Sequence, residues 1–294
     1  MSGQVDSDTA PQTPLGIICG GGAFPAQVAE AVLRGGRPIF MLGVQGVAEP
    51  AIERFPHAWF RLIELRRVRK LLQQIGCREV CIIGHMARPP LGSMTLDRES
   101  LRLLPRLAQL YRGGDDRLLT GVAGLIEEVL SLKVLGARDV APDLLAPAGS
   151  FGRHQPSADD HEDIACGIAV LAALGPFDVG QSVVVARRRV LAIESAEGTD
   201  AMIARIAALR ANGGLDLPRG VGVLIKAPKP RQDLRVDLPA IGPRTVENIV
   251  AAGLAGIAVI AEGAIVADAE RLIAAADRAN VFVFGAPAKR DNTP

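Results

Sequence analysis

The feature that most constrains the fold of this chain is a regular alternation of short apolar runs with amphipathic stretches. The run LGIIC from Leu15 is followed by a glycine turn, a helical pattern over residues 26–33 and a second apolar run at 38–42. This order is typical of a βαβ unit with parallel strands. The alternation continues with an apolar patch at 59–63, a helix at 67–75 and a strand at 80–84. The pattern therefore predicts an α/β fold with a parallel sheet and helices on its faces.

The second half of the chain predicts another α/β unit with a mixed sheet. Two helices, 96–110 and 117–135, precede a segment rich in proline and glycine that has no sustained period. We interpret residues 136–150 as a linker between an N-terminal domain at 14–135 and a C-terminal domain at 151–286. In the second domain we expect helices at 157–174, 199–211, 245–253 and 268–280, a hairpin of the runs QSVVVA and RVLAIE, and strands at 221–226, GIAVIA and VFVFG.

Composition excludes several classes of function. The chain has 294 residues, enough for two cores, and a net charge of +1 with 3% aromatic residues. Without an overall positive field or aromatic stacking platforms, a nucleic-acid partner is not expected. The polar first fourteen residues do not form a signal peptide, and no apolar run is long enough to cross a membrane.

The cysteines point to a reducing compartment. All four, Cys19, Cys77, Cys81 and Cys166, lie within apolar runs, which is typical of buried thiols in a cytoplasmic protein. Cys77, Cys81 and His85 are evenly spaced, but this is not a zinc spacing, so the zinc interpretation is the weaker one.

A triple glycine at 20–22 follows the first strand and opens a helix. Backbone N–H groups and the helix dipole at such a turn favour a phosphate, but a simple reversal of the chain explains the glycines equally well. A dinucleotide fingerprint would need a glycine where Pro25 stands and an acid where Gly43 stands. Both interpretations of the turn stay open.

The segment GHMARP follows the strand at 80–84, where open α/β sheets bind ligands. Arg88 is the candidate there, because a guanidinium can grip a phosphate or uridine oxygen, whereas His85 is expected to be structural. Asp115 and Asp116 begin a helix, and they either cap it or hold a divalent cation.

Acidic residues crowd between a strand and a helix at Glu194, Glu197 and Asp200. Thr199 or Asp200 can cap the helix, but Glu194 and Glu197 have no such role. Like charges at close range are unfavourable unless a cation or a proton lies between them. This segment therefore predicts a metal ion or a basic cluster.

The prolines of the segment KAPKPRQDLRVDLP, residues 226–239, exclude a helix. In an extended chain Asp233, Arg235 and Asp237 would share one face, while Leu234, Val236 and Leu238 pack behind them. A row of carboxylate, cation and carboxylate suits diphosphate chemistry with Mg²⁺. The alternative is a solvated edge strand, but that would not need the cations upstream, which are Lys226, Lys229 and Arg231. Further along, Thr245 is expected to cap a second helix that can bind an anion.

Together these motifs resemble the LpxI-type UDP-2,3-diacylglucosamine pyrophosphatases of lipid A biosynthesis. The likeness runs from Leu15 to Gly285 through LGIICGGGAFP, GHMARP, GGDDRLL, AIESAEGTDAMI, KAPKPRQDLRVDLPAIGPRT and VFVFG. The resemblance implies a Rossmann-like N-terminal domain, a distinct α/β C-terminal domain, and hydrolysis of UDP-2,3-diacylglucosamine to 2,3-diacylglucosamine 1-phosphate (lipid X) and UMP. It further implies Mg²⁺, with Mn²⁺ as an alternative.

The same resemblance assigns roles to particular residues. It places catalysis on Asp233, Asp237 and Arg235, and the metal ion on Asp233, Glu197 and Asp200. Taken with the motifs themselves, it leads us to expect substrate binding at Gly21, Gly22, Ala23, Phe24, Arg88, Thr199, Lys226, Lys229, Gln232 and Thr245. A lipid-linked UDP-sugar as substrate implies a cytoplasmic protein in peripheral contact with lipid of the inner membrane, and a homodimer is left open.

Two other functions compete with hydrolysis. A nucleotide-sugar-binding or regulatory protein would hold a UDP ligand without turning it over, but diphosphate binding alone does not explain so many carboxylates. A nicotinamide oxidoreductase is disfavoured because the third glycine and the ribose-binding acid are absent.

Overall fold

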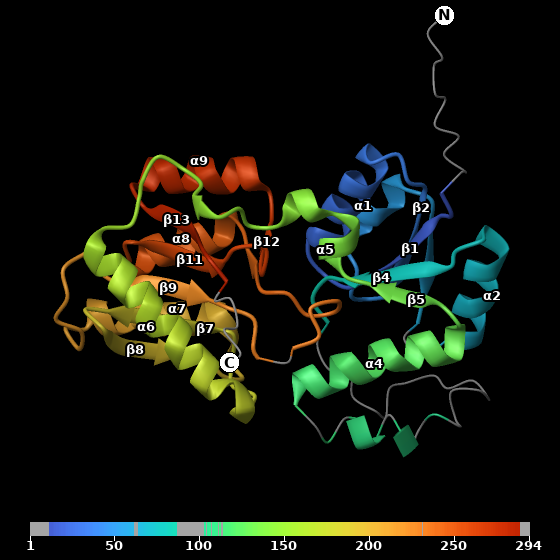
Figure 1. Ribbon diagram of the computed structural model, residues 1–294, viewed down its shortest axis with the longest axis horizontal. Coiled ribbons are helices and arrows are strands. Elements are labelled where there is room, and N and C mark those ends of the chain that lie inside the picture. Colours follow the sequence, from blue (N-terminus) through green and yellow to red (C-terminus); the bar gives the residue numbers. More distant parts are fainter. Residues whose placement is uncertain are drawn as a thin grey trace, which may run out of the picture. The chain divides into compact units, whose positions relative to one another are not determined.

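The computed structural model describes residues 12–61, 64–86, 103, 105–106, 108–110, 112, 114–230 and 232–288, with the backbone alone at 115 and 116. The chain divides into two compact units, the first comprising residues up to Arg112 with 121–140, the second comprising 113–120 with the chain from Ala141 onward (Figure 1). The border at 140/141 lies inside the segment 136–150 that was predicted to be a linker. Within the described ranges, no helix is both long and apolar enough to span a bilayer.

The first unit is built on a five-stranded parallel sheet of order β3-β2-β1-β4-β5 (Figure 1). Its strands are β1 (Leu15–Cys19), β2 (Ile39–Val44), β3 (His57–Phe60), β4 (Glu79–Ile83) and β5 (Lys133–Leu135). This order is that of a doubly wound fold, in which the direction of strand addition reverses between β1 and β4. The predicted Rossmann-like parallel sheet is confirmed.

Helices cover the sheet of the first unit. Among the described residues they include α1 (Phe24–Arg34), α2 (Leu65–Ile75), α4 (Asp115–Leu130) and α5 (Ala137–Val140), with 3₁₀ turns η1 (Pro50–Arg54) and, just past the border, η3 (Pro142–Leu144). Helix α1 packs against α5 on one face of the sheet. It begins two residues before the predicted start because Pro25 fits its first turn, where no N–H donor is needed.

One strand of this sheet was mistaken for the end of a helix. Residues 117–135 were predicted as one helix, but α4 ends at Leu130 and Lys133–Leu135 form β5 beside β4. Ser131 has a φ of 56°, a left-handed conformation that ends the helix. Because apolar residues continue across this break, hydrophobic periodicity alone did not reveal it.

The second unit contains a six-stranded mixed sheet of order β6-β13-β11-β9-β7-β8. Strands β9, β11 and β13 are parallel, whereas β6, β7 and β8 pair antiparallel with their neighbours. The bounds are β6 (Gly149–Ser150), β7 (Ser182–Ala186), β8 (Arg189–Ile193), β9 (Val223–Lys226), β11 (Gly256–Ile260) and β13 (Phe282–Ala286), with a separate parallel pair β10 (Ala240–Ile241) and β12 (Ile265–Val266). The predicted mixed sheet and the β7–β8 hairpin are confirmed; β6, β10 and β12 are too short to be seen in the sequence.

Helices lie on both faces of this sheet. They are α6 (Ala158–Leu174), which η4 (Gly175–Phe177) follows, α7 (Gly198–Ala211), α8 (Pro243–Ala252) and α9 (Ala269–Ala279). Helix α6 packs against β7 and β9, while α7, α8 and α9 pack side by side on the opposite face (Figure 1).

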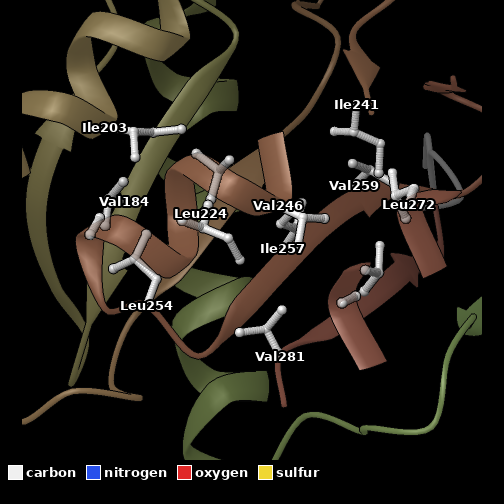
Figure 2. Packing of buried hydrophobic residues seen from close by; sticks show 14 of the residues in the cluster. Val184, Ile203, Leu224, Ile241, Val246, Leu254, Ile257, Val259, Leu272 and Val281 are labelled. Carbon is white, nitrogen blue, oxygen red and sulfur yellow. The ribbon is translucent and has the colours of Figure 1, made fainter. Parts of the chain in front are cut away.

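The core on the α7–α9 face is formed by aliphatic side chains of the sheet and of the three helices. Figure 2 shows Val184, Leu224 and Ile257 from the strands pointing toward Ile203 and Val246 from the helices. Each of these five side chains is at most 1% exposed. A second cluster, which includes Ile164, Val183 and Ile225, fills the α6 face. Burial of both faces explains why the strands read as continuous apolar runs.

Candidate functional site

Three strand ends of the second unit meet at one edge of its sheet. Lys226 ends β9 and pairs with Ser182, which begins the antiparallel β7, and Val183 in turn pairs with Ile193 at the end of β8. Because the strands alternate in direction here, Gln181 before β7 lies beside Glu194 after β8. The polar residues of this edge lie far apart in the sequence but adjacent in the fold.

Lys226 is the cation that the acidic segment after β8 requires. Its Nζ donates to Thr199 Oγ1 at 3.1 Å and to the Ala240 carbonyl at 3.2 Å. Thr199 Oγ1 in turn donates to Glu194 Oε1 at 2.9 Å. Burial lowers the pKa of Lys226, and the carboxylates of Glu194, Asp200 and Asp237 oppose that shift. Lys226 is thus a basic residue near Glu194, joined to it through Thr199, and a metal ion at this segment stays a prediction.

The segment 233–237 is a turn, which corrects the predicted extended strand. The amides of Val236 and Asp237 both donate to the Asp233 carbonyl, at 3.1 and 3.2 Å. The Asp233 carboxylate also accepts from the Arg235 amide at 3.1 Å, a local bond that aspartate side chains often make in turns. The pattern of prolines and charges in the sequence gave no sign of this hydrogen bond. The expected division into a polar and an apolar face is absent, since all residues from 233 to 238 are partly buried.

Asp233 is ion-paired within this turn. Arg235 Nε donates to Asp233 Oδ1 at 3.0 Å and Nη2 to Oδ2 at 2.8 Å, which makes a bidentate pair. The hydrogen bond from Arg235 lowers the pKa of Asp233, although partial burial opposes the shift. The side chains are 14% exposed for Asp233 and 38% for Arg235. Asp233 therefore stays ionised throughout the physiological range while its partner reaches solvent.

Two side-chain amide groups donate hydrogen bonds to Asp237. Its Oδ2 accepts from Gln181 Nε2 at 2.8 Å and from Gln232 Nε2, which also donates to the Asp237 carbonyl at 2.9 Å. Gln232 is only 8% exposed, and its Oε1 accepts from the Lys229 amide at 2.7 Å. Lys229 Nζ pairs with Asp178 Oδ1 at 2.5 Å. The structure thus brings Asp233, Arg235, Asp237, Gln232, Lys226, Lys229 and Thr199 into one region of the second unit.

Two residues of this region escaped the sequence prediction. Gln181 stands before an apolar strand and Asp178 lies in a loop after α6, and no local pattern marks either of them. Glu194 was noticed only because it had no capping role.

Glu197 and Asp200 are not grouped with Asp233 in the structure. Glu197 Oε1 pairs with Arg205 at 2.8 Å and its other oxygen accepts from Ser195. Asp200 pairs with Arg244 at 2.7 Å and accepts from Asn248 at 2.8 Å. Over the ranges that the structure describes, no three acid, histidine or cysteine side chains gather in a way that would hold a metal ion. The expected metal set of Asp233, Glu197 and Asp200 therefore has separate partners.

Thr245 accepts a hydrogen bond at the N-terminus of α8. The N-cap is Gly242 rather than Thr245, because Pro243 takes the first helical position, and Thr245 Oγ1 accepts from the Gly242 amide at 3.2 Å. The helix therefore starts two residues before the predicted bound.

In the first unit, the glycine turn packs against the loop after β4. The amides of Gly20 and Gly21 donate to the carbonyls of Ile83 (2.8 Å) and His85 (2.7 Å), and the His85 amide donates back to Gly21 at 2.9 Å. A Cβ at Gly20 would lie 2.6 Å from the His85 carbonyl oxygen, and one at Gly84 would lie 2.8 Å from the Gly20 carbonyl carbon. The close approach of the two loops accounts for these glycines, and the amides of Gly20 and Gly21 already have acceptors.

The other candidates of the first unit are the residues at the start of α1 and Arg88. Gly22 has a φ of 88°, Ala23 caps α1 without a side-chain hydrogen bond, and Phe24 is the first helical residue. Arg88 lies outside the described residues, as does Arg231 of the second unit.

The cysteines are free thiols, and Cys19, Cys77 and Cys81 are buried. Burial raises the pKa of Cys19 and of Cys81 to about 12. These thiols behave as small apolar side chains, and they do not form a zinc group with His85.

The fold and the site define a two-unit α/β protein whose mixed-sheet unit gathers carboxylates, amides and basic side chains around one turn. Two family models match the chain, the LpxI N-terminal domain over residues 14–144 and the LpxI C-terminal domain over 147–284. The chain belongs to the LpxI family. It is similar to the UDP-2,3-diacylglucosamine pyrophosphatase LpxI of Caulobacter vibrioides, with 38% identity over 271 residues that cover 92% of this chain and 96% of the relative.

Proposed function

We propose that this protein hydrolyses the diphosphate bond of UDP-2,3-diacylglucosamine, giving 2,3-diacylglucosamine 1-phosphate and UMP for lipid A synthesis. The observation that carries the proposal is the Asp233–Asp237 turn with Lys226 and Lys229 beside it, in a chain 38% identical to a pyrophosphatase of that name. Water adds to one phosphorus, the bridging P–O bond breaks, and the two phosphates leave on separate products.

The residues of the turn suit this reaction. The planar guanidinium of Arg235 can contact a phosphoryl oxygen at its solvent-exposed edge while it remains paired with Asp233. Lys226 and Lys229 add positive charge around the position where negative charge develops as the bond breaks. Asp233 is ionised and fixed by Arg235, so it is suited to orient the attacking water or to bind a cation.

We further propose that the reaction uses Mg²⁺, or Mn²⁺ in its place. Mg²⁺ in phosphate-transfer sites is held by one or two carboxylates together with substrate phosphates, so a cage of three protein carboxylates is not required. Asp233 and Asp237, which belong to one turn, are the residues that would share it; Glu197 and Asp200 have other partners. A cation there would neutralise charge on the diphosphate.

The proposal is tested by incubating the purified protein with UDP-2,3-diacylglucosamine and measuring UMP by chromatography. One arm contains Mg²⁺, one Mn²⁺, and one excess chelator. We expect UMP and lipid X in equal amounts with either metal ion and none with chelator. UMP release that persists undiminished in chelator would remove the metal ion from the proposal but leave hydrolysis intact, whereas intact substrate in all arms would contradict hydrolysis.

We place the protein in the cytoplasm, at the inner-membrane surface where a diacylated substrate resides. Its four cysteines are unpaired, which suits a reducing compartment. Sedimentation of the protein with vesicles that contain the substrate, compared with vesicles that lack it, tests the membrane contact.

A further inference from the structure

Asp233 and Asp237 are held in different ways, although they belong to the same turn. Asp233 faces a guanidinium, which compensates its charge. Asp237 Oδ2 accepts hydrogen bonds from two neutral amide groups, those of Gln181 and Gln232. Neutral donors fix the direction of a carboxylate, so the two aspartates differ in the groups that orient them.

Of the two amide groups, Gln181 is anchored outside the turn. Its backbone N–H donates to Glu194 Oε2 at 3.1 Å, and its carbonyl accepts from the Ala227 amide at 3.0 Å. Glu194 is itself held by Thr199, the residue that Lys226 contacts. Gln232, by contrast, lies in the same loop as Asp237.

Gln181 therefore connects the sheet to the turn. The hydrogen bonds of its main chain belong to the edge where β7, β8 and β9 meet, and its side chain reaches Asp237 at 2.8 Å. A carboxylate that must meet a reacting group loses effectiveness when it is displaced by about 1 Å, by as much as ~10²-fold in rate. A donor from Gln181, whose main chain is hydrogen-bonded directly before β7, opposes such a displacement.

We propose that Gln181 is a positioning residue, which orients the Asp237 carboxylate toward the diphosphate through its side-chain amide while Glu194 fixes its backbone. The inference rests on the proposed function, and it adds a residue from outside the proline-rich segment to the site.

Truncation of the Gln181 side chain to a methyl group tests the orientation. Gln181→Ala is expected to lower kcat for UMP release by roughly 10–100-fold, with KM changed less than about threefold, because the substrate still meets the cations of the turn. The matched control is Glu162→Gln, an exposed change on α6 that should retain wild-type kcat and KM. Equal urea midpoints for all three proteins exclude a folding defect.

Gln181→Glu gives a signature that a purely structural role would not. A carboxyl group at this position faces the Asp237 carboxylate, and two like charges at this distance share one proton, so the apparent pKa of the pair rises. When protonated, the new side chain still donates to Asp237 as glutamine does; when ionised, it repels Asp237. The kcat of this variant relative to wild type should therefore fall by about tenfold or more between pH ~5.5 and ~8, while the same ratio for Gln181→Ala stays flat.

A titration without substrate separates this inference from the proposed function. Carboxyl ¹³C NMR should show a pair with a raised apparent pKa in Gln181→Glu and none in Gln181→Ala. Wild-type UMP release with unchanged kcat in both variants would overturn the positioning role and leave hydrolysis standing. If wild-type protein released no UMP, the proposed function would fall, and an unshifted titration in Gln181→Glu would overturn the contact itself.

Discussion

The turn of the β7–β8 hairpin depends on one buried carboxylate, and its removal gives a sharp test of the fold of the second unit. Arg187 and Arg188 have φ angles of 52° and 60°, a left-handed pair that glycine or asparagine normally occupies. Their amides donate to Asp163 Oδ2 at 3.0 Å and to Oδ1 at 2.5 Å. Asp163 lies on α6 and is only 3% exposed.

The expected effect of Asp163→Ala follows from these two bonds. Hydrogen bonds to a charged group contribute about 1.5–3 kcal/mol each, and each left-handed residue costs roughly 1–2 kcal/mol. Because the turn residues are exposed, water replaces part of the lost bonding. We therefore expect Asp163→Ala to lower the free energy of unfolding by about 2–4 kcal/mol, and Asp163→Asn, which keeps one acceptor, by about half as much.

Urea unfolding followed by circular dichroism measures the loss. The control is Glu162→Ala, which removes only the exposed Glu162–Arg188 pair at 3.3 Å and should change stability by less than about 0.5 kcal/mol. Asn-Gly in place of Arg187-Arg188 should restore about 1–2 kcal/mol to Asp163→Ala, because these residues adopt the left-handed conformation readily. An Asp163→Ala variant as stable as the control would refute the claim that this carboxylate holds the turn.

Two further predictions follow from the pKa shifts. Arg235→Gln removes the main cause of the lowered pKa of Asp233, so the pKa rises toward its ordinary value of 3.8. The acid limb of the pH–stability profile then moves to higher pH. Carboxyl ¹³C NMR of Asp233 should show the rise in pKa, and an unchanged titration would contradict the assigned cause. Burial keeps Cys19 and Cys81 protonated to about pH 12, so Ellman's reagent at pH ~8 should modify Cys166 first and the other two only in urea. Rapid reaction of all thiols in the folded protein would contradict the described burial.

The sequence predicted the larger elements because these are long and periodic. Runs such as LGIIC and VFVFG are buried on both faces, so they are continuously apolar and easily recognised as strands. β5 was missed because Leu132 to Leu135 continue the apolar pattern of α4, and the break depends on the backbone of Ser131. β6, β10 and β12 have two residues each and no period to detect.

The sequence predicted several residues that gather at the site, but it did not predict how they are arranged. Asp233, Arg235 and Asp237 do gather, but the turn that joins them is held by a side-chain bond from Asp233 to the Arg235 amide, which alternation rules ignore. Gln181 reaches Asp237 across 56 positions of the chain, so no local motif could indicate it. The resemblance to a family suggested the roles of these residues, whereas hydrogen-bond partners that are distant in the sequence emerge only from the three-dimensional structure.

The central claim is that the diphosphate bond is broken at the turn that contains Asp233. The most direct test measures binding and turnover in one sample of Asp233→Ala, with equilibrium dialysis of UDP-2,3-diacylglucosamine and chromatography of UMP. The account predicts a folded protein that retains the substrate and releases UMP at least about 10²-fold more slowly than wild type. Release of UMP at the wild-type rate would contradict it.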